Sequence, residues 1–453
     1  MNSTPVIAIF DIGKTNKKLF LFDEDYKVVY EKSEQLAETT DEDGEACEDI
    51  AALQAFVVNA LTEILKLKSY SVKAVNFSTY GASLIYVNEN GQPLTPLYNY
   101  LKKYPESLKD QFYSKYGGEE EFSIVTASSV LGSLNSGLQL YRFKMEQPEL
   151  FTNMKYALHL PQYISSLVSH QFCSECTSIG CHTGMWDYKK QAYHSWINEE
   201  NLLEILPPLC PANSTFTTLW NDQPITSGIG LHDSSAALIP YLANFNESFI
   251  LISTGTWCIS LNPFNELPLT SEELKQDCLC YLTYQNKPVK ASRLFAGNEH
   301  DQQVKRLAAH FKKPLHYYMG IPFNQETGIL FSAGNSSDEA FESMDLLKFP
   351  DYSTAYFTLM NSIVKQQIVS TKLVMKGAEI KRLFVDGGFS KNSYYMNLLA
   401  QAMPDIEVYA ASMAQASALG AALVIHSTWN TKPIPKDLIE LKYYSGRKEI
   451  RNL

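Results

Sequence analysis

The chain lacks a long apolar run, an excess of positive charge and a dense set of cysteines, and each absence excludes a class of protein. No stretch of its 453 residues approaches the roughly 18 consecutive apolar residues of a membrane helix. The first apolar run, residues 6–10, ends at Asp11 and is too short for a secretory signal. The formal net charge of −11 argues against a nucleic-acid partner, which would require a basic face. We therefore expect a cytoplasmic protein with neither a membrane nor a nucleic acid among its partners.

The 8 cysteines in this length match a reducing compartment better than a disulfide framework. Cys173 and Cys176, followed by Cys181, could form a zinc cluster, but their spacing is irregular and no second pair follows. Buried or incidental thiols are the favoured interpretation, and the zinc cluster is the alternative.

The length exceeds what one hydrophobic core usually supports, so two domains are expected. Strand patterns alternate with helix patterns along the chain, which indicates an α/β architecture. We place the boundary between the last helix of the first half and the next strand. The predicted domains are residues 1–243 and 244–453.

A strand-and-turn element occurs twice. Apolar runs at residues 6–10 and 249–252 each lead into a polar turn with a glycine, Gly13 or Gly255, and a second apolar run follows each turn. Both patterns predict a buried strand, a tight turn and a returning strand. Backbone N–H groups and hydroxyls in such turns suit phosphate oxygens. The repeat predicts two related domains that present their turns to a shared cleft.

The first turn is not a P-loop, although Gly13-Lys14-Thr15 looks like the end of one. That motif needs a glycine five positions before Gly13, where the chain has Ala8, and it needs a helix rather than a strand afterwards. Asp11, at the strand end, could hold Mg²⁺ through water, because hard divalent cations prefer oxygen ligands. The alternative is that Asp11 only caps the turn.

Between the two turns, the acidic segment 39–49 is typical of a solvated loop, with a cation site as the alternative. A helix of period 3.6 follows, with one apolar face made of Leu53, Phe56, Val57, Ala60, Leu61 and Ile64. A strand at 72–77 then enters a turn at 78–83, and we expect residues 84–87 to be its returning strand, closed by a hairpin turn at 88–91.

Two later elements carry candidate chemistry. A strand at 382–385 enters Asp386-Gly387-Gly388, where two glycines would let a flat ligand lie against bare backbone, although a turn alone needs only one. Asp233 precedes an alanine-rich helix, where it is either an N-cap or a general base that takes a proton from a sugar hydroxyl. A helix of small residues at 414–424 is expected to pack closely against its neighbours.

These pieces, in this order, resemble the FGGY carbohydrate kinases of the actin-like, ribonuclease-H-like ATPase superfamily, and most closely their rhamnulokinase and fuculokinase branch. The resemblance covers residues 6 to about 425 and rests on Asp11-x-Gly-Lys-Thr-Asn16, Thr79-Tyr-Gly81, Gly230-x-His-Asp-Ser234, Ser253-Thr-Gly-Thr-Trp257 and Gly387-Gly-Phe-Ser-Lys-Asn392. It implies two actin-like domains, residues 1–243 with the sugar site and catalytic base and residues 244–453 with the nucleotide site, on either side of an interdomain cleft. ATP and Mg²⁺ are the implied cofactors, and a homodimer is compatible with it.

The resemblance also implies roles for individual residues. Asp233 would be the catalytic base and Asp11 would lie near the metal. The sugar would be contacted by Gly81, His232, Asp233 and Ser234. ATP would be bound by Gly13, Lys14, Thr15, Asn16, Thr254, Gly255, Thr256, Asn298, Gly387, Gly388 and Asn392.

The chain departs from the family pattern at several positions. Lys14 stands where a small hydroxyl residue is more usual, Phe389 replaces a third glycine, and Gln415 replaces a glutamate. The turn at 80–83 has no acidic residue for sugar recognition, which leaves the identity of the sugar open.

The expected activity is ATP-dependent phosphorylation of a ketose hydroxyl, with a 6-deoxyketose such as rhamnulose or fuculose, or a pentulose, as the acceptor. The alternatives are a kinase of a polyol such as glycerol or erythritol, and a non-catalytic sensor of nucleotide or sugar. The unusual Lys14 would suit a sensor, whereas the presence of both Asp11 and Asp233 argues against one.

Overall fold

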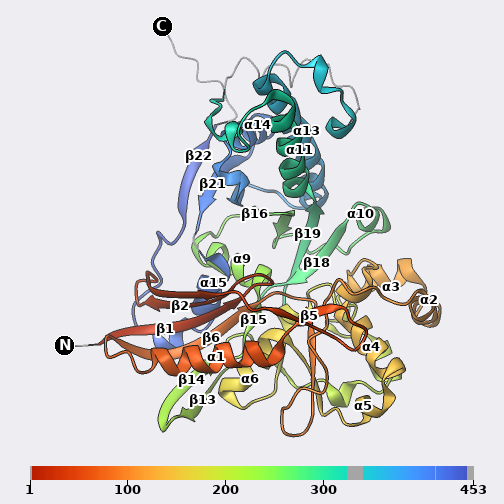
Figure 1. Ribbon diagram of the computed structural model, residues 1–453, viewed down its shortest axis with the longest axis vertical. Coiled ribbons are helices and arrows are strands. Elements are labelled where there is room, and N and C mark those ends of the chain that lie inside the picture. Colours follow the sequence, from red (N-terminus) through yellow and green to blue (C-terminus); the bar gives the residue numbers. More distant parts are fainter. Residues whose placement is uncertain (1–2, 324–339, 414, 446–453) are drawn as a thin grey trace.

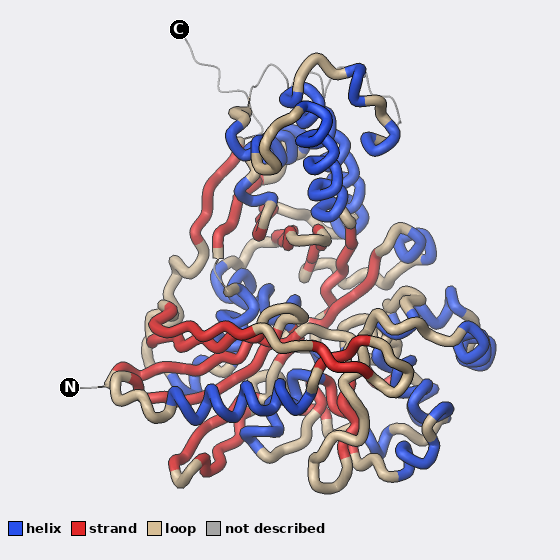
Figure 2. Tube along the Cα trace, viewed as in Figure 1, coloured by secondary structure: helices blue, strands red, loops and turns tan. Residues whose placement is uncertain are grey.

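The computed structural model describes residues 3–323, 340–413 and 415–445, and it contains two large β-sheets that are flanked by helices (Figure 1). Each sheet mixes parallel and antiparallel strands, and Figure 2 shows helices and strands interleaved in both lobes. The α/β class predicted from the sequence is confirmed.

The first sheet consists, in order across the sheet, of β13 (Thr215–Trp220), β14 (Gln223–Gly228), β6 (Tyr70–Thr79), β1 (Thr4–Ile12), β2 (Lys17–Asp23) and β3 (Val28–Glu34), with β15 (Leu231–His232) beside β6. The strands β1, β2 and β3 form an antiparallel meander, whereas β1 and β6 run parallel. The carboxyl ends of β1 and β6 therefore lie at the same edge.

The second sheet consists, in order, of β18 (Cys278–Leu282), β19 (Pro288–Leu294), β17 (Cys258–Asn262), β16 (Phe249–Thr254), β20 (Arg382–Gly387), β21 (Glu407–Ser412) and β22 (Glu440–Tyr444). Here β16 pairs antiparallel with β17 and parallel with β20. This arrangement repeats that of β1, β2 and β6. The hairpin that the sequence predicts twice is therefore present twice, once in each sheet.

Helices cover the sheets because each carries one apolar face. All six residues predicted for the apolar face of α1 (Ile50–Ile64) are buried. This helix and α6 (Leu160–Ser169) cover one face of the first sheet, and α9 (Asp233–Asn244) and α15 (Ala416–Val424) cover the other. The second sheet packs against α11 (Ala296–Phe311), α13 (Tyr352–Met375) and α14 (Ser393–Ala402) on one face and against α9 on the other.

Helices α9 and α15 cross each other at close range between the two sheets (Figure 1). A Cβ at Gly420 would lie 1.8 Å from the carbonyl oxygen of Ala236, so the crossing requires glycine. The predicted close packing of the small-residue helix is confirmed over the helix itself, while Ala414 lies outside the described residues.

The other α-helices of the described residues are short, and most lie in residues 100–220. They are α2 (Glu106–Lys115), α3 (Glu119–Thr126), α4 (Ser136–Glu146), α5 (Pro148–Thr152), α7 (Cys176–Ile179), α8 (Ser195–Glu199), α10 (Ser271–Lys275) and α16 (His426–Trp429). The described residues also form four two-stranded sheets: β4 (Glu38–Thr40) with β5 (Ala46–Glu48), β7 (Leu84–Val87) with β8 (Tyr156–His159), β9 (Ser174–Glu175) with β12 (Leu209–Cys210), and β10 (Trp186–Asp187) with β11 (Ala192–Tyr193).

One strand pairing predicted from the sequence is wrong. The strand β7 does not return along β6, because it pairs antiparallel with β8, which lies about 70 residues later. The turn at residues 88–91 does form, with the Gly91 N–H donating to the Asn88 carbonyl oxygen (3.0 Å). The sequence located the strand and the turn but not the partner strand.

The prediction of a solvated acidic loop at 39–49 is also wrong in part. The segment forms the β4–β5 hairpin, in which Asp41 and Glu48 are buried. Lys102 Nζ lies 2.5 Å from Asp41 Oδ2, and Lys17 pairs with Glu48. Lysines distant in sequence compensate these two carboxylates, while the acidic residues at the tip stay exposed.

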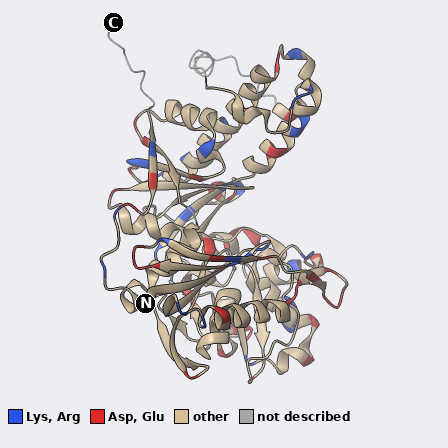
Figure 3. Ribbon diagram, turned by 60° about the vertical axis from the view of Figure 1, so that its left-hand side comes forward, with Lys and Arg blue, Asp and Glu red and all other residues tan. Residues whose placement is uncertain are grey.

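The surface carries charge of both signs. In the view of Figure 3, Lys and Arg residues are interspersed with Asp and Glu over both lobes. Among the described residues, none of the helices has the length and apolar character needed to cross a membrane.

Candidate active site

The turn after β1 is closed by one backbone hydrogen bond, from the Gly13 N–H to the Asn16 carbonyl oxygen (3.0 Å). Two of its side chains engage neighbours on the outside. Lys14 Nζ lies 3.2 Å from Glu38, and Asn16 Oδ1 accepts a hydrogen bond from Gln35 (2.9 Å). The backbone of the turn, rather than these side chains, is thus the part open to a ligand.

Asp11 lies at the end of β1, next to this turn. Its Oδ1 accepts a hydrogen bond from Ser417 Oγ of α15 (3.0 Å), so the alternative in which Asp11 only caps its own turn is not what the contacts show. Burial raises the pKa of Asp11 to about 6, and the nearby charge of Asp233 adds to the rise. The two carboxylates that the sequence singled out are therefore electrostatic neighbours, although they are more than 200 residues apart.

Asp233 is the first residue of α9, and His232 occupies the N-cap position, so Asp233 is not the N-cap. The hydrogen bonds and the histidine contact that it makes within the described residues fall on one oxygen. Oδ1 accepts from the Ser234 N–H (2.6 Å) and from Ser234 Oγ (3.2 Å), and it lies 3.2 Å from His232 Nε2. Within the part of the chain that the structure describes, Oδ2 has no hydrogen-bond partner. Burial raises the pKa of Asp233 to about 6.

His232 and Gly81 meet beside this carboxylate. Burial lowers the pKa of His232 to about 4, so the imidazole is neutral at pH 7 and can donate from Nε2 to Asp233. His232 Nε2 also lies 3.2 Å from Cys181 Sγ. A Cβ at Gly81 would lie 2.6 Å from that sulfur, so the turn needs glycine in order to pass over Cys181 and His232.

Tyr100 is a neighbour of this group that the sequence analysis missed. Burial raises its pKa, and the charge of Asp233 raises it further, which places the phenol near the carboxylate. Its ring centroid lies 5.9 Å from that of Tyr80, in the turn that also holds Gly81. Nothing in the local sequence distinguishes Tyr100 from the chain's 27 tyrosines, so only the fold identifies it.

The thiols of the zinc cluster considered as an alternative do not converge. Cys173 Sγ lies 3.3 Å from Cys210 Sγ, Cys176 contacts Glu175, and Cys181 contacts His232. In the described parts of the chain, no three His, Cys, Asp or Glu side chains are placed to hold a metal ion.

The turn after β16 has a similar form, with the Gly255 N–H donating to the Trp257 carbonyl oxygen (2.9 Å). The Thr254 hydroxyl is already used. It donates to the Asp386 carbonyl oxygen (2.5 Å) and accepts from the Phe389 N–H (3.0 Å), which fixes this turn to the one after β20. Thr256 is exposed, and its carbonyl oxygen accepts from the Asn298 N–H (3.1 Å) at the start of α11.

Two glycines lie at the carboxyl end of β20, and only one of them is required by the surrounding backbone. Gly387 has a φ of +90°, and a Cβ there would lie 1.9 Å from the carbonyl oxygen of Thr254, so the protein's own backbone demands glycine. Gly388 has no such demand, since the nearest atom to its Cβ would be 4.0 Å away. The space beside Gly388, like that beside Gly255, is therefore left open for something other than the protein.

That space is a cavity of about 540 Å³, within the range of small-molecule sites. It contains three residues predicted to bind nucleotide, Gly255, Gly388 and Asn392. Asn392 also caps α14 through Tyr395 N–H (3.1 Å) and donates to Tyr356 Oη (2.7 Å). The other lining residues, which the sequence analysis did not assign to the nucleotide, are Gly297, His300, Asp301, Tyr318, Met319, Ile321, Phe389, Lys391, Ser393 and Tyr394.

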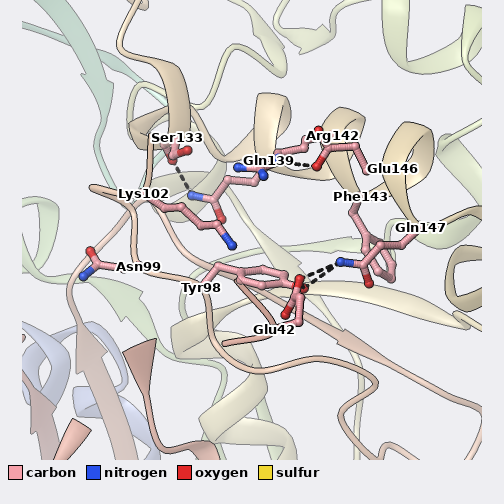
Figure 4. A pocket seen from close by; sticks show the side chains of 10 residues that line it. All are labelled: Glu42, Tyr98, Asn99, Lys102, Ser133, Gln139, Arg142, Phe143, Glu146 and Gln147. Carbon is pink, nitrogen blue, oxygen red and sulfur yellow. Dashed lines mark hydrogen bonds and ion pairs between the residues drawn. The ribbon is translucent and has the colours of Figure 1, made fainter. Parts of the chain in front are cut away.

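A much smaller cavity of about 30 Å³ lies in the first lobe (Figure 4). Its polar side chains largely satisfy one another: Glu42 accepts from Tyr98 Oη (2.6 Å) and from Gln147 (2.7 Å), and Arg142 pairs with Glu146 (2.6 Å). The lining is Glu42, Tyr98, Asn99, Lys102, Ser133, Gln139, Arg142, Phe143, Glu146 and Gln147. The network braces the loop that leads to Tyr100 and leaves little room for a ligand.

Models of one protein family match both halves of the chain. The N-terminal domain of the FGGY family of carbohydrate kinases matches residues 6–239, and its C-terminal domain matches residues 353–429. The chain belongs to the FGGY family of carbohydrate kinases. A rhamnulokinase from Mannheimia succiniciproducens is 20% identical over 267 residues, which are 56% of this chain and 52% of that protein. The chain spans about half the length of the curated relatives it matches.

Solved structures extend the similarity of this FGGY chain to its whole fold. A carbohydrate kinase from Novosphingobium aromaticivorans has a TM-score of 0.78 at 20% identity, covering 98% of this chain and 95% of that one. A ligand-bound xylulose kinase from Lactobacillus acidophilus has a TM-score of 0.77 at 14% identity, covering 97% and 93%. The two-lobed, actin-like fold that the resemblance predicted is confirmed.

Proposed function

We propose that this FGGY chain transfers a phosphoryl group from ATP to a hydroxyl of a ketose, either a 6-deoxyketose such as rhamnulose or fuculose, or a pentulose. Membership of the family supports a carbohydrate acceptor, and the similarity to rhamnulokinase supports a 6-deoxyketose. The observation that carries the proposal is the carboxylate of Asp233, which is anchored through Oδ1 and, among the described residues, has no hydrogen-bond partner at Oδ2.

Asp233 is suited to act as the general base. With a pKa of about 6, it is largely ionised at pH 7 but more basic than an ordinary aspartate. Ser234 and His232 hold Oδ1, which aims Oδ2 at the proton of a sugar hydroxyl. In this proposal Gly81, His232 and Ser234 border the sugar together with Tyr100.

Asp11 is suited to a magnesium ion. Mg²⁺ in phosphoryl-transfer sites is bound through one or two carboxylates together with water and substrate phosphates, so a full set of protein ligands is not required. The raised pKa of Asp11 reflects burial and a neighbouring negative charge, both of which a cation would offset. Bound Mg²⁺ would neutralise charge on the phosphate oxygens during transfer.

The cavity beside Gly255 and Gly388 is suited to the adenosine of ATP, with Gly387, Asn392 and Asn298 shaping its edge. The turns at 13–16 and 254–256 would then bind the phosphates through backbone N–H groups and the Thr15 and Thr256 hydroxyls. We also propose that residues 1–243 and 244–453 act as the acceptor and nucleotide domains, although α15 of the second range packs on the first sheet.

The test is a panel of ketoses and polyols assayed for ADP release, with Asp233→Asn as the inactive control. We expect turnover with a 6-deoxyketose or a pentulose and none above background in the variant. Turnover confined to glycerol or erythritol would instead identify a polyol kinase. ATP binding without product on any acceptor would contradict the proposal and leave a sensor.

A further inference from the structure

Lys17, the first residue of β2, is a buried lysine that the site described above does not use. Its side chain is only 3% exposed. Nζ donates to the carbonyl oxygens of Gly13 (3.2 Å) and Lys14 (3.0 Å), and it forms an ion pair with the carboxylate of Glu48. The ammonium group therefore faces two backbone carbonyls and one carboxylate.

Glu48 connects this network to the turn after β6. Its second oxygen accepts a hydrogen bond from Tyr80 Oη, and the Tyr80 N–H donates to the carbonyl oxygen of Ile12 (3.1 Å). The buried pair thus lies between the turn after β1 and the turn after β6.

Stability alone does not account for such a pair. Removing two charges from water is costly, and replacing a buried ion pair by neutral side chains of similar volume is often neutral or stabilising. Two apolar side chains, however, could not donate hydrogen bonds to the two carbonyl groups of the turn. The contacts of Lys17 therefore point to the conformation of residues 13–16.

The geometry of the peptide bond links these carbonyl contacts to the direction of the neighbouring N–H groups. In a trans peptide the C=O and the following N–H point in opposite directions. The Gly13 carbonyl shares its peptide with the Lys14 N–H, and the Lys14 carbonyl shares its peptide with the Thr15 N–H. With both carbonyls held on Lys17 Nζ, both N–H groups point away from the lobe interior, and within the described chain neither has a hydrogen-bond partner.

We propose that Lys17 is the positioning residue of the nucleotide phosphate turn: its ammonium group holds the Gly13 and Lys14 carbonyls inward, so that the Lys14 and Thr15 N–H groups face a phosphate. The proposal rests on the function proposed above. It also accounts for the conspicuous Lys14, whose own ammonium group pairs with Glu38 and is not needed for the phosphate.

The decisive variant is Lys17→Met with Glu48→Gln, which removes both charges without leaving either one buried and unpaired. We expect it to unfold thermally near the wild-type temperature and to bind MgADP at least tenfold more weakly in calorimetry, while the KM for the sugar changes less than twofold. Glu48→Gln alone keeps the ammonium group on the carbonyls and is expected to retain MgADP affinity within about threefold. The matched control is Lys32→Met with Glu63→Gln, which removes a surface ion pair between β3 of the same sheet and α1.

Each other outcome has a definite meaning. A folded double variant that binds MgADP like the wild type would overturn the role of Lys17, and so would failure of the double variant to fold, since Lys17 would then act only on stability. Wild-type protein that binds no MgADP would refute the proposed function instead, so the two failures are distinguishable.

Discussion

Replacing Asp233 by asparagine should abolish activity and at the same time stabilise the protein. The catalytic part follows from the loss of a general base, which is typically worth 10² to 10⁴-fold in rate. The stability part follows from the environment of the carboxylate, because burial raises the pKa of Asp233 to about 6. A rise from about 4 to about 6 corresponds to about 3 kcal/mol against the ionised form in a fully enclosed site. The side chain is 36% exposed, so solvent screening reduces the expected gain to about 1 kcal/mol.

The pH dependence of this gain is the sharper test. Above pH 6 the wild-type carboxylate is ionised in both the folded and the unfolded state, so the folded protein carries the full free-energy cost of burying the charge. Towards pH 4 the folded protein keeps the proton, so the penalty and the advantage of asparagine both vanish. Thermal unfolding of both proteins at pH 8 and pH 5, with Asp405→Asn as an exposed control, measures the difference. The reasoning fails if the variant is less stable at pH 8, or if its advantage grows as the pH falls.

Three further predictions concern the same site. Because a protonated Asp233 cannot accept a proton, kcat/KM for the sugar should fall about tenfold per pH unit below pH 6, and a flat profile from pH 5 to pH 8 would refute it as the base. Gly387→Ala should lower the unfolding temperature, whereas Gly388→Ala should leave it unchanged and weaken MgADP binding in calorimetry; the opposite order would contradict the roles assigned to these glycines. Ser417→Ala removes a hydrogen bond that lowers the pKa of Asp11, so the apparent Mg²⁺ affinity near pH 6.5 should fall several-fold in a kinetic titration, and an unchanged affinity would exclude Asp11 from the metal site.

The sequence predicts those parts of the fold that produce a pattern among neighbouring residues. Both hairpins are visible because an apolar run, a glycine turn and a second apolar run lie next to one another in the chain. The apolar face of α1 is visible because its residues recur with the helical period. Asp11, Gly255 and Gly387 are recognisable for the same reason, since each lies at the end of a buried strand or directly after it.

The parts that it misses depend on partners far away in the chain. The pairing of β7 with β8 spans about 70 residues, and no local signal distinguishes it from a return along β6. The local sequence predicts that Asp41 and Glu48 are solvated, because the lysines that compensate their charges lie on other elements. Ser417 belongs to a helix that the sequence analysis treated only as packing, yet it provides a hydrogen bond to Asp11.

One helix connects the two halves of the site. Helix α9 begins at Asp233, beside Asp11 at the end of β1, and eight residues later Tyr241 Oη donates to Asp386 Oδ2 (3.2 Å) at the end of β20. At a rise of about 1.5 Å per residue, Asp233 and Tyr241 lie about 12 Å apart along the helix. A helix does not change length easily, so the distance between the proposed base and the glycine turn that borders the nucleotide cavity is set within α9. Any closure of the lobes that alters this distance must therefore displace the loops at the two ends of the helix rather than the helix itself.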